Sequence, residues 1–408
     1  MEDIQKQTLA RLLPNAAVGP ELIVPRSKLP EDLRVELEAS ASVKILVAGQ
    51  RGMGKSTELR RLEALIASSE MIPVFVQFGA QESITHPMLL RAMARALQAR
   101  LPERLSSKVT SRFQAWFAHE EEVVETEEGS GGSASVGGKA FVLKAEKGVH
   151  HKNTKKTTTK LVKPKNVDEL VNLFNELVNE GRKASEAKIA FIVDDIDKIQ
   201  DTSSIESTFV DASQTITAID APCIFTVPIT YATSSSLRPA TLAYGGIYRV
   251  PAVEVLNEDG TANTAGIDHM KDVLKRRMPY SPIPGEVLEK IVISSGGVYT
   301  DAMRLARALC KRAILDDGFV IDAAACDEAF QILVDDYKFV FDTPGLWKTL
   351  AKMCIATSKT VIMTEEKLAD LLYKMIVIEY REKKLWFDVH PAARRLYEQN
   401  AEVLTAML

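Results

Sequence analysis

Short apolar runs alternate with amphipathic segments through the first part of the chain. The runs at 43–48 and 72–78 are bounded by turn residues, as expected for buried strands. Each is followed by a segment whose apolar residues repeat at helical spacing, at 57–66 and at about 87–101. Strands and helices that alternate at this spacing predict a parallel sheet covered by helices, which is the α/β class.

The alternation is interrupted between about 119 and 165. An acidic run from Glu120 to Glu128 precedes a Gly-Ser joint and a lysine-rich stretch, and we interpret the whole as an insertion. Two interpretations stay open for it: a solvated loop whose charge blocks attract each other, or a basic arm that touches phosphate backbones.

Regular patterns resume beyond the insertion. A helix is predicted from 167 to near Gly181, and strands at 189–193 and 223–230. The segment 267–337 reads as helices only, and from 344 onward helices precede two short strands at 377–380 and 385–389, which is the order of a winged helix. The predicted organisation is an N-terminal helical lead-in at 1–42, an α/β core at 43–256, a helical lid at 257–340 and a winged-helix domain at 341–408.

A glycine-rich turn joins the first strand to the first helix of this core. The segment Gly49–Ser56 matches GxxxxGK[ST] in full and lies between strand and helix, where that motif has to lie. Glycines let backbone amides close around an anion, and the helix N-terminus adds positive charge. Lys55 is expected to bridge the β- and γ-phosphates, and the Ser56 hydroxyl to bind Mg²⁺. The expected nucleotide-binding residues are Gly49, Gln50, Arg51, Gly52, Met53, Gly54, Lys55, Ser56 and Thr57.

Three acids follow the buried strand at 189–193. Ligands of open α/β sheets bind at the carboxyl ends of the strands, so these acids should face the phosphate-binding loop. We assign Asp194 to Mg²⁺ through water, and Asp195 to the attacking water. Asp197 is expected to be a helix cap or a local ion-pair partner.

At these motifs the chain resembles the AAA+/STAND branch of P-loop ATPases. It is most similar to the origin-recognition and initiator-like clade and to bacterial STAND-type ATPases of antiviral gene clusters, over about residues 22–388. The resemblance implies ATP rather than GTP, and a polar γ-phosphate sensor after the strand at 223–230, for which Thr230 is the first candidate and Thr226 the second. It also implies a lid arginine near Tyr299, where the first arginine of this chain is Arg304.

Two roles of Arg304 stay open: contact with phosphate, or pairing with Asp301. Arg238 and Arg249 are candidates for a finger arginine that acts on a neighbouring subunit, and a homo-oligomer therefore stays open. The aspartate at 195, where relatives more often carry glutamate, is consistent with slow hydrolysis suited to a switch.

Three functions follow from these features. The first is an ATP-hydrolysing switch or assembly factor that acts on a partner protein, with antiviral defence implied by the resemblance. The second is a DNA-binding initiator or loader that uses the hairpin tip at 381–384 and the basic insertion at 139–165. The third is a P-loop fold that binds ATP without hydrolysing it.

The composition of the chain bears on its binding partners and its cellular location. The 408 residues carry a formal net charge of −4, so any attraction to nucleic acid has to come from a local patch. The four cysteines are far apart and form no metal-binding pair, as expected in a reducing compartment. No apolar stretch reaches the roughly 20 residues of a membrane span. A cytoplasmic location is therefore expected.

Overall fold

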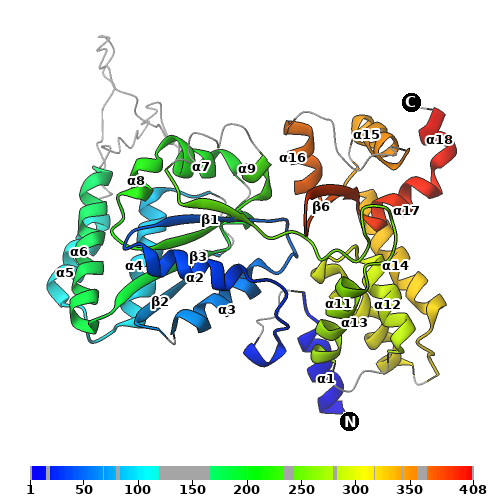
Figure 1. Ribbon diagram of the computed structural model, residues 1–408, viewed down its shortest axis with the longest axis horizontal. Helices are drawn as coiled ribbons and strands as arrows, with labels where there is room; N and C mark the ends of the chain where they lie inside the picture. Colours follow the sequence, from blue (N-terminus) through cyan, green and yellow to red (C-terminus); the bar gives the residue numbers. More distant parts are fainter. Residues whose placement is uncertain are drawn as a thin grey trace, which may run out of the picture.

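The computed structural model consists of an α/β part and a mainly helical part that lie side by side (Figure 1). It describes residues 2–14, 19–67, 69–79, 83–118, 166–199, 201–233, 243–278, 283–316, 318–341, 343–355 and 365–406. The expected insertion at 119–165 lies outside the described residues. The first helix, α1 (Glu2–Arg11), packs on the helical part rather than on the sheet.

A five-stranded parallel sheet forms the centre of the α/β part. Its strand order is β2-β3-β4-β1-β5, and every pairing between neighbours is parallel. The strands are β1 (Lys44–Ala48), β2 (Met71–Gln77), β3 (Lys188–Asp194), β4 (Cys223–Val227) and β5 (Gly246–Arg249). The predicted α/β class with a parallel sheet is confirmed. The edge strand β5 was not predicted, because its four residues are only partly buried and form no continuous apolar run.

Helices cover both faces of the sheet, as parallel strands require. One face packs on α4 (His86–Arg100), α5 (Ser107–Ala118) and α6 (Val167–Ser185), and the other on α2 (Leu29–Ala39) and α3 (Lys55–Ala67). Successive strand residues alternate between the two cores: Leu46 packs with the first set of helices, and Ile45 and Val47 with the second.

The termini of α6 show why this segment forms a helix. The Asn166 side chain accepts a hydrogen bond from the Asp168 amide at 3.0 Å, which caps the first turn. Acidic residues occupy the first turn and Arg182 and Lys183 the last, so both ends complement the helix dipole. Seven residues of one face are buried against the sheet.

Beyond the sheet the chain is mainly helical. A short helical turn, η1 (Pro20–Leu22), follows α1 in the chain. Short elements around β3 and β4 are η2 (Ile196–Lys198), α7 (Thr202–Glu206), η3 (Ser207–Asp211), α8 (Ser213–Thr217) and α9 (Ile229–Thr233). The helical part contains α11 (Thr264–Arg277), α12 (Gly285–Ser294), α13 (Tyr299–Leu315), α14 (Ala323–Lys338), α15 (Pro344–Ile355), α16 (Glu365–Tyr373), β6 (Val377–Arg381), β7 (Leu385–Val389), α17 (Pro391–Gln399) and α18 (Ala401–Ala406).

The expected lid and the expected winged helix share one apolar core. Leu288 and Leu309 from the first segment pack in the same cluster as Leu372 and Leu396 from the second. The strands β6 and β7 pair antiparallel, with Val377 opposite Val389, as the hairpin pattern predicted. The boundary near residue 340 and the winged-helix assignment stay predictions.

The β6–β7 hairpin also belongs to the core of the α/β part. Ile378, Tyr380 and Trp386 pack in the same apolar cluster as Ile45 and Val47 of β1. The rings of Tyr380 and Trp386 stack with centroids 4.4 Å apart. The C-terminal hairpin is therefore held against the element that leads into the phosphate-binding loop.

Candidate functional site

The loop between β1 and α3 adopts the backbone shape that its glycines predict. Gly52 and Gly54 have φ values of +80° and +81°, which favour glycine because a Cβ is strained in this region. A Cβ at Gly49 would lie 2.6 Å from the Val250 carbonyl oxygen. Met53 is buried and anchors the middle of the loop. Loop amides of this shape at the N-terminus of a helix such as α3 are suited to bind an anion.

The ammonium group of Lys55 lies at the centre of this loop. It donates to the carbonyl oxygens of Gly49 at 2.7 Å and Gln50 at 2.8 Å, and lies 2.9 Å from Asp197 Oδ2. The side chain is 6% exposed, so its charge is balanced inside the protein. The β- and γ-oxygens of a triphosphate would compete with Asp197 for this ammonium.

The strand end of β3 meets the first turn of α3. The Ser56 side chain faces Asp194, whose Oδ1 accepts from the Asp195 amide at 2.8 Å. Burial raises the pKa of Asp194, and the charges of Asp195 and Asp197 raise it further, while the Ser56 hydroxyl lowers it. A carboxylate destabilised in this way gains from a nearby cation.

These groups fit the Mg²⁺ that the motif implies. One carboxylate oxygen from each of Asp194, Asp195 and Asp197 lies within 4.8 Å of the others, and Ser56 adds a hydroxyl that is exposed to solvent. Carboxylate and hydroxyl oxygens are hard donors of the kind that Mg²⁺ prefers. The structure therefore brings together Lys55, Ser56 and Asp194, the residues that the sequence assigned to phosphate and metal.

Both carboxylate oxygens of Asp195 have protein donors. Oδ1 lies 2.5 Å from Lys198 Nζ, and Oδ2 accepts from Gln77 Nε2 at 3.1 Å. Burial lowers the pKa of Lys198, but the hydrogen bond and charge of Asp195 outweigh it, so that this pKa is raised. Gln77, the last residue of β2, has a place in the site that the sequence did not indicate.

The two sensor candidates lie at different places. The strand β4 ends at Val227, so Thr230 stands in the first turn of α9 rather than at the strand end that the sequence predicted. Its hydroxyl is buried and has no hydrogen-bond partner among the described residues. Thr226 is buried in β4 and accepts from the Ile196 amide at 3.2 Å, which holds the turn that carries the acids.

The segment expected to form a lid meets the loop through Tyr299 and Thr300, at the start of α13, rather than through an arginine. A Cβ at Gly54 would lie 3.3 Å from the Tyr299 ring, and one at Gly52 would lie 2.2 Å from Thr300 Oγ1. Arg304 pairs instead with Asp301 and Asp336 on the helical part. Of the two roles left open for Arg304, the structure shows the local pairing and no contact with the loop.

Another arginine, from the N-terminal segment, approaches Tyr299. The Arg26 guanidinium lies 5.6 Å from the centroid of the Tyr299 ring and donates to the Pro251 carbonyl at 2.9 Å. The hydroxyl of Tyr299 lies 2.7 Å from His269 Nε2. Burial, together with the charge of Arg26, lowers the pKa of His269 to about 4, which keeps this ring neutral near pH 7.

The finger candidates differ in what the structure shows of them. Arg238 lies outside the described residues. Arg249 ends β5 and contacts the carboxylate of Glu379 and the carbonyl of Ala232 within the same chain. Its side chain is 15% exposed. In this arrangement it joins the sheet to the β6–β7 hairpin.

The second residue of the phosphate-binding loop is joined to the C-terminal hairpin. The Gln50 amide donates to the carbonyls of Leu372 at 2.9 Å and Val377 at 2.7 Å, and accepts from the Glu379 amide at 2.8 Å. Gln50 is 3% exposed. The sequence did not indicate this contact, because Gln50 bonds to backbone groups of the C-terminal part, which no side-chain pattern marks.

Neighbouring contacts also connect the phosphate-binding loop to the C-terminal part. The Arg51 guanidinium lies 5.2 Å from the centroid of the Tyr373 ring, at the end of α16. The Ala252 amide donates to the Glu379 carbonyl at 3.0 Å. Burial raises the pKa of the Glu379 carboxyl, and the guanidinium of Arg249 lowers it. The loop, β5 and the C-terminal hairpin thus share one buried polar network.

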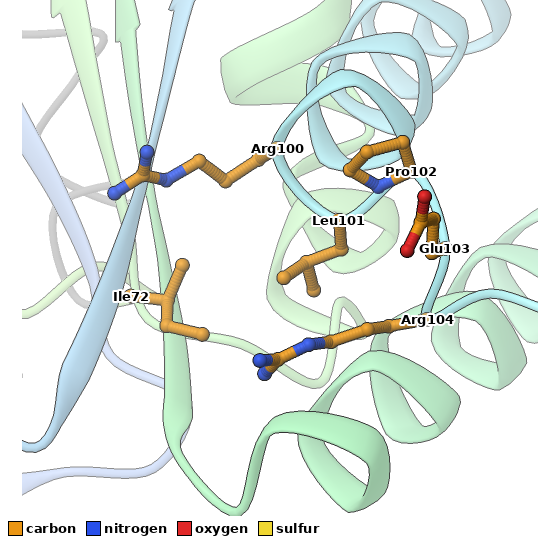
Figure 2. A pocket seen from close by; sticks show the side chains of 6 residues that line it. All are labelled: Ile72, Arg100, Leu101, Pro102, Glu103 and Arg104. Carbon is orange, nitrogen blue, oxygen red and sulfur yellow. The ribbon is translucent and has the colours of Figure 1, made fainter.

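A separate cavity of about 330 Å³ lies by the start of β2 and the end of α4. Arg100 and Arg104 extend around Ile72 and Leu101 at its wall (Figure 2). This is the amino-terminal edge of the sheet, away from the carboxyl edge where nucleotides bind in open α/β folds. We assign it no role in the nucleotide site.

The sheet, the loop and the acidic strand end define a P-loop NTPase. Residues 31–210 match the model of the family described as the KAP family P-loop domain. This match covers the loop and the acidic strand end, and confirms the predicted P-loop class. No curated protein matches the chain. Among the described residues, no helix has both the length and the apolarity needed to cross a bilayer.

Several solved structures resemble the whole chain. A Walker-type ATPase, paby2304 of Pyrococcus abyssi, is 13% identical with a TM-score of 0.47, covering 92% of this chain and 96% of that one. The ORC1 protein of Aeropyrum pernix, in complex with DNA, is 14% identical with a TM-score of 0.47 and 98% coverage of both chains. The Cdc6p of Pyrobaculum aerophilum is 11% identical with a TM-score of 0.43, covering 96% and 98%. At such identities and scores, these likenesses add nothing to what the loop and the sheet establish.

Proposed function

We propose that this protein binds ATP with Mg²⁺ at the P-loop, hydrolyses it, and uses the bound nucleotide to control the position of its C-terminal hairpin. The observation that carries the proposal is the buried contact of Gln50, a residue of the phosphate-binding loop, with the backbone of α16 and β6. A change in the loop on nucleotide binding would reach the C-terminal part directly through this side chain.

The binding residues follow from the contacts of the loop. The amides of Gly52 to Ser56 and the N-terminus of α3 hold the phosphates, and Lys55 moves from Asp197 to the β- and γ-oxygens. Ser56 and Asp194 are the residues that would hold Mg²⁺, which when bound neutralises the charge on these oxygens. Thr230, whose hydroxyl has no partner among the described residues, is the proposed γ-phosphate sensor.

The hydrogen bonds of Gln50 are weak enough for nucleotide binding to break them. Each buried hydrogen bond of Gln50 contributes on the order of 1 kcal/mol, so the joint is worth about 3 kcal/mol. Inverting a two-state population from 1:99 to 99:1 takes about 5.5 kcal/mol of differential binding. Contacts of a triphosphate with Lys55, the loop amides and Mg²⁺ can supply a difference of this size.

A partner protein would receive the movement of the hairpin. This extension is supported by the absence of a second catalytic motif in the sequence and by the resemblance to STAND-type ATPases, which also underlies a role in antiviral defence. The same resemblance supports assembly into oligomers. Freeing the intramolecular contact of Arg249 would be required before that residue could act on a neighbouring subunit.

The alternative of a DNA-binding initiator receives less support from the hairpin tip. Lys384 lies 2.5 Å from Glu258, and the Glu382 amide donates to Glu254 at 2.7 Å, so part of the tip is already held by acids. Titration of a duplex at low and high salt separates the functions: several phosphate contacts would produce a steep loss of affinity with salt.

Hydrogen exchange of β6 with and without nucleotide tests the switch. The proposal predicts that Mg-ATP changes the exchange of amides 377–381 by at least tenfold, and that Mg-ADP produces a different level. Lys55→Ala should abolish both effects because it removes the ammonium that binds the phosphates. Equal exchange in all three states of the unmodified protein would refute the proposed coupling, even if ATP binds.

A further inference from the structure

Asp197 is the acid of the cluster whose carboxylate is incompletely paired. It lies in η2 with its side chain 4% exposed. Oδ2 pairs with Lys55 Nζ at 2.9 Å, whereas Oδ1 is buried and has no hydrogen-bond partner among the described residues. A buried carboxylate oxygen without a hydrogen-bond donor destabilises the folded protein, so a ligand that donates to this atom would be bound favourably.

The other two acids are already engaged. Asp194 accepts from the amide of Asp195 and faces the Ser56 hydroxyl. Asp195 holds Lys198 with one oxygen and Gln77 with the other. Each oxygen of Asp195 already has one protein donor, whereas Asp197 Oδ1 has none among the described residues, so a water in line with the γ-phosphate would supply the first hydrogen bond to that buried atom.

Binding of a triphosphate would increase the difference in pairing between Asp195 and Asp197. Lys55 would turn its ammonium to the β- and γ-oxygens, and Asp197 would then lose the ion pair that the described part of the chain gives it. Both of its oxygens would remain buried beside the group that contacts the γ-phosphate. A water that donates to Asp197 Oδ1 would satisfy this carboxylate beside the phosphate-binding ammonium.

We propose that Asp197, and not Asp195, is the catalytic residue that orients the attacking water. This inference rests on the proposed ATP hydrolysis. Water oxygen forms a bond to the γ-phosphorus while the bond from phosphorus to the bridging oxygen breaks, and its electron pair leaves with ADP. A proton passes from the water to Asp197 Oδ1 and then to the released phosphate. Asp195 is a positioning residue that fixes the turn through Gln77 and Lys198.

Single-turnover hydrolysis in matched variants tests the assignment. Asp197→Asn keeps the shape but removes the proton acceptor, and should slow hydrolysis by at least about 100-fold. Its affinity for Mg-ATP should stay within about threefold or become tighter. Asp195→Asn should lose about tenfold or less. Asp327→Asn, which removes an exposed acid paired with Lys290, controls for the loss of a charge and should match the unmodified protein.

Analogue trapping provides a readout that does not depend on turnover. ADP with beryllium fluoride mimics the ground state, and ADP with aluminium fluoride mimics the state in which water is held in line. Asp197→Asn should keep the first complex and lose at least about tenfold in the second. Asp195→Asn should keep both. Partial recovery of hydrolysis in Asp197→Glu would support a role of the carboxylate itself.

The results of these experiments distinguish a failure of the proposed ATP hydrolysis from a failure of the role assigned to Asp197. An unmodified protein that neither binds nor hydrolyses Mg-ATP would overturn the proposed function and this inference with it. Hydrolysis that survives in Asp197→Asn at the unmodified rate would overturn the inference alone. If Asp197→Asn does not fold, Asp195→Asn still decides: loss of both turnover and aluminium fluoride trapping, with ATP affinity retained, would return the role to Asp195.

Discussion

Replacing Gln50 by Ala should loosen the C-terminal hairpin without touching the phosphate-binding groups. The side chain makes three buried hydrogen bonds to backbone atoms of α16 and β6. At about 1 kcal/mol each, their loss should cost about 2–3 kcal/mol of local stability, because water can repair part of the network. A difference of this size corresponds to an increase of roughly 30- to 150-fold in local opening.

Hydrogen exchange followed by mass spectrometry measures this opening directly. Amides of β6 should exchange faster in Gln50→Ala by this factor, while those of β3 should change little. Gln399→Ala is the matched control, since that glutamine makes one exposed hydrogen bond to Gln331 and should change local stability by less than about 0.5 kcal/mol. If β6 exchange is unchanged in a folded Gln50→Ala protein, Gln50 does not join the loop to the hairpin.

Three further results are expected. Gly54→Ala should weaken nucleotide binding at least tenfold and cost about 1–2 kcal/mol in urea unfolding, whereas Gly260→Ala, which has a similar φ but open surroundings, should cost only stability. Arg249→Ala and Glu379→Ala should be non-additive by at least about 1 kcal/mol in a double-mutant cycle, because each alone leaves a buried charge unpaired; additive losses would contradict the pairing. The pKa of His269 is lowered to about 4 in the folded protein, so the unfolded chain binds a proton at this residue more readily. The free energy of unfolding should therefore fall by about 1–2 kcal/mol as pH drops from 6.5 to 4, a value that allows for screening by solvent. His269→Gln should remove this pH dependence, and an unchanged pH dependence in the variant would refute the assignment.

Local sequence patterns were sufficient to predict the α/β class and the loop. Strands β1 and β3 are continuous apolar runs buried on both faces, and the glycines of the loop require backbone conformations that few other residues adopt. The meeting of Ser56 with Asp194 follows from the same rule, because parallel strands end at one edge of the sheet.

Local sequence patterns could not predict the contacts between segments that are distant in the chain. Gln50 reads as a variable position of the loop motif, and its role depends on a hairpin more than 300 residues away. Asp197 was expected to be a cap or a local ion-pair partner, and its actual partner, Lys55, comes from another element. The partly buried β5 and the lid contact of Tyr299 depend in the same way on how the helical part packs against the sheet.

Isothermal titration of the purified full chain with ATP and Mg²⁺ tests the nucleotide site most directly. The arrangement of Lys55, Ser56 and Asp194 predicts saturable heat with a dissociation constant in roughly the micromolar range, weakened at least about tenfold by Lys55→Ala. Absence of heat with the unmodified protein, or equal affinity in Lys55→Ala, would contradict the assignment of this loop as the triphosphate site.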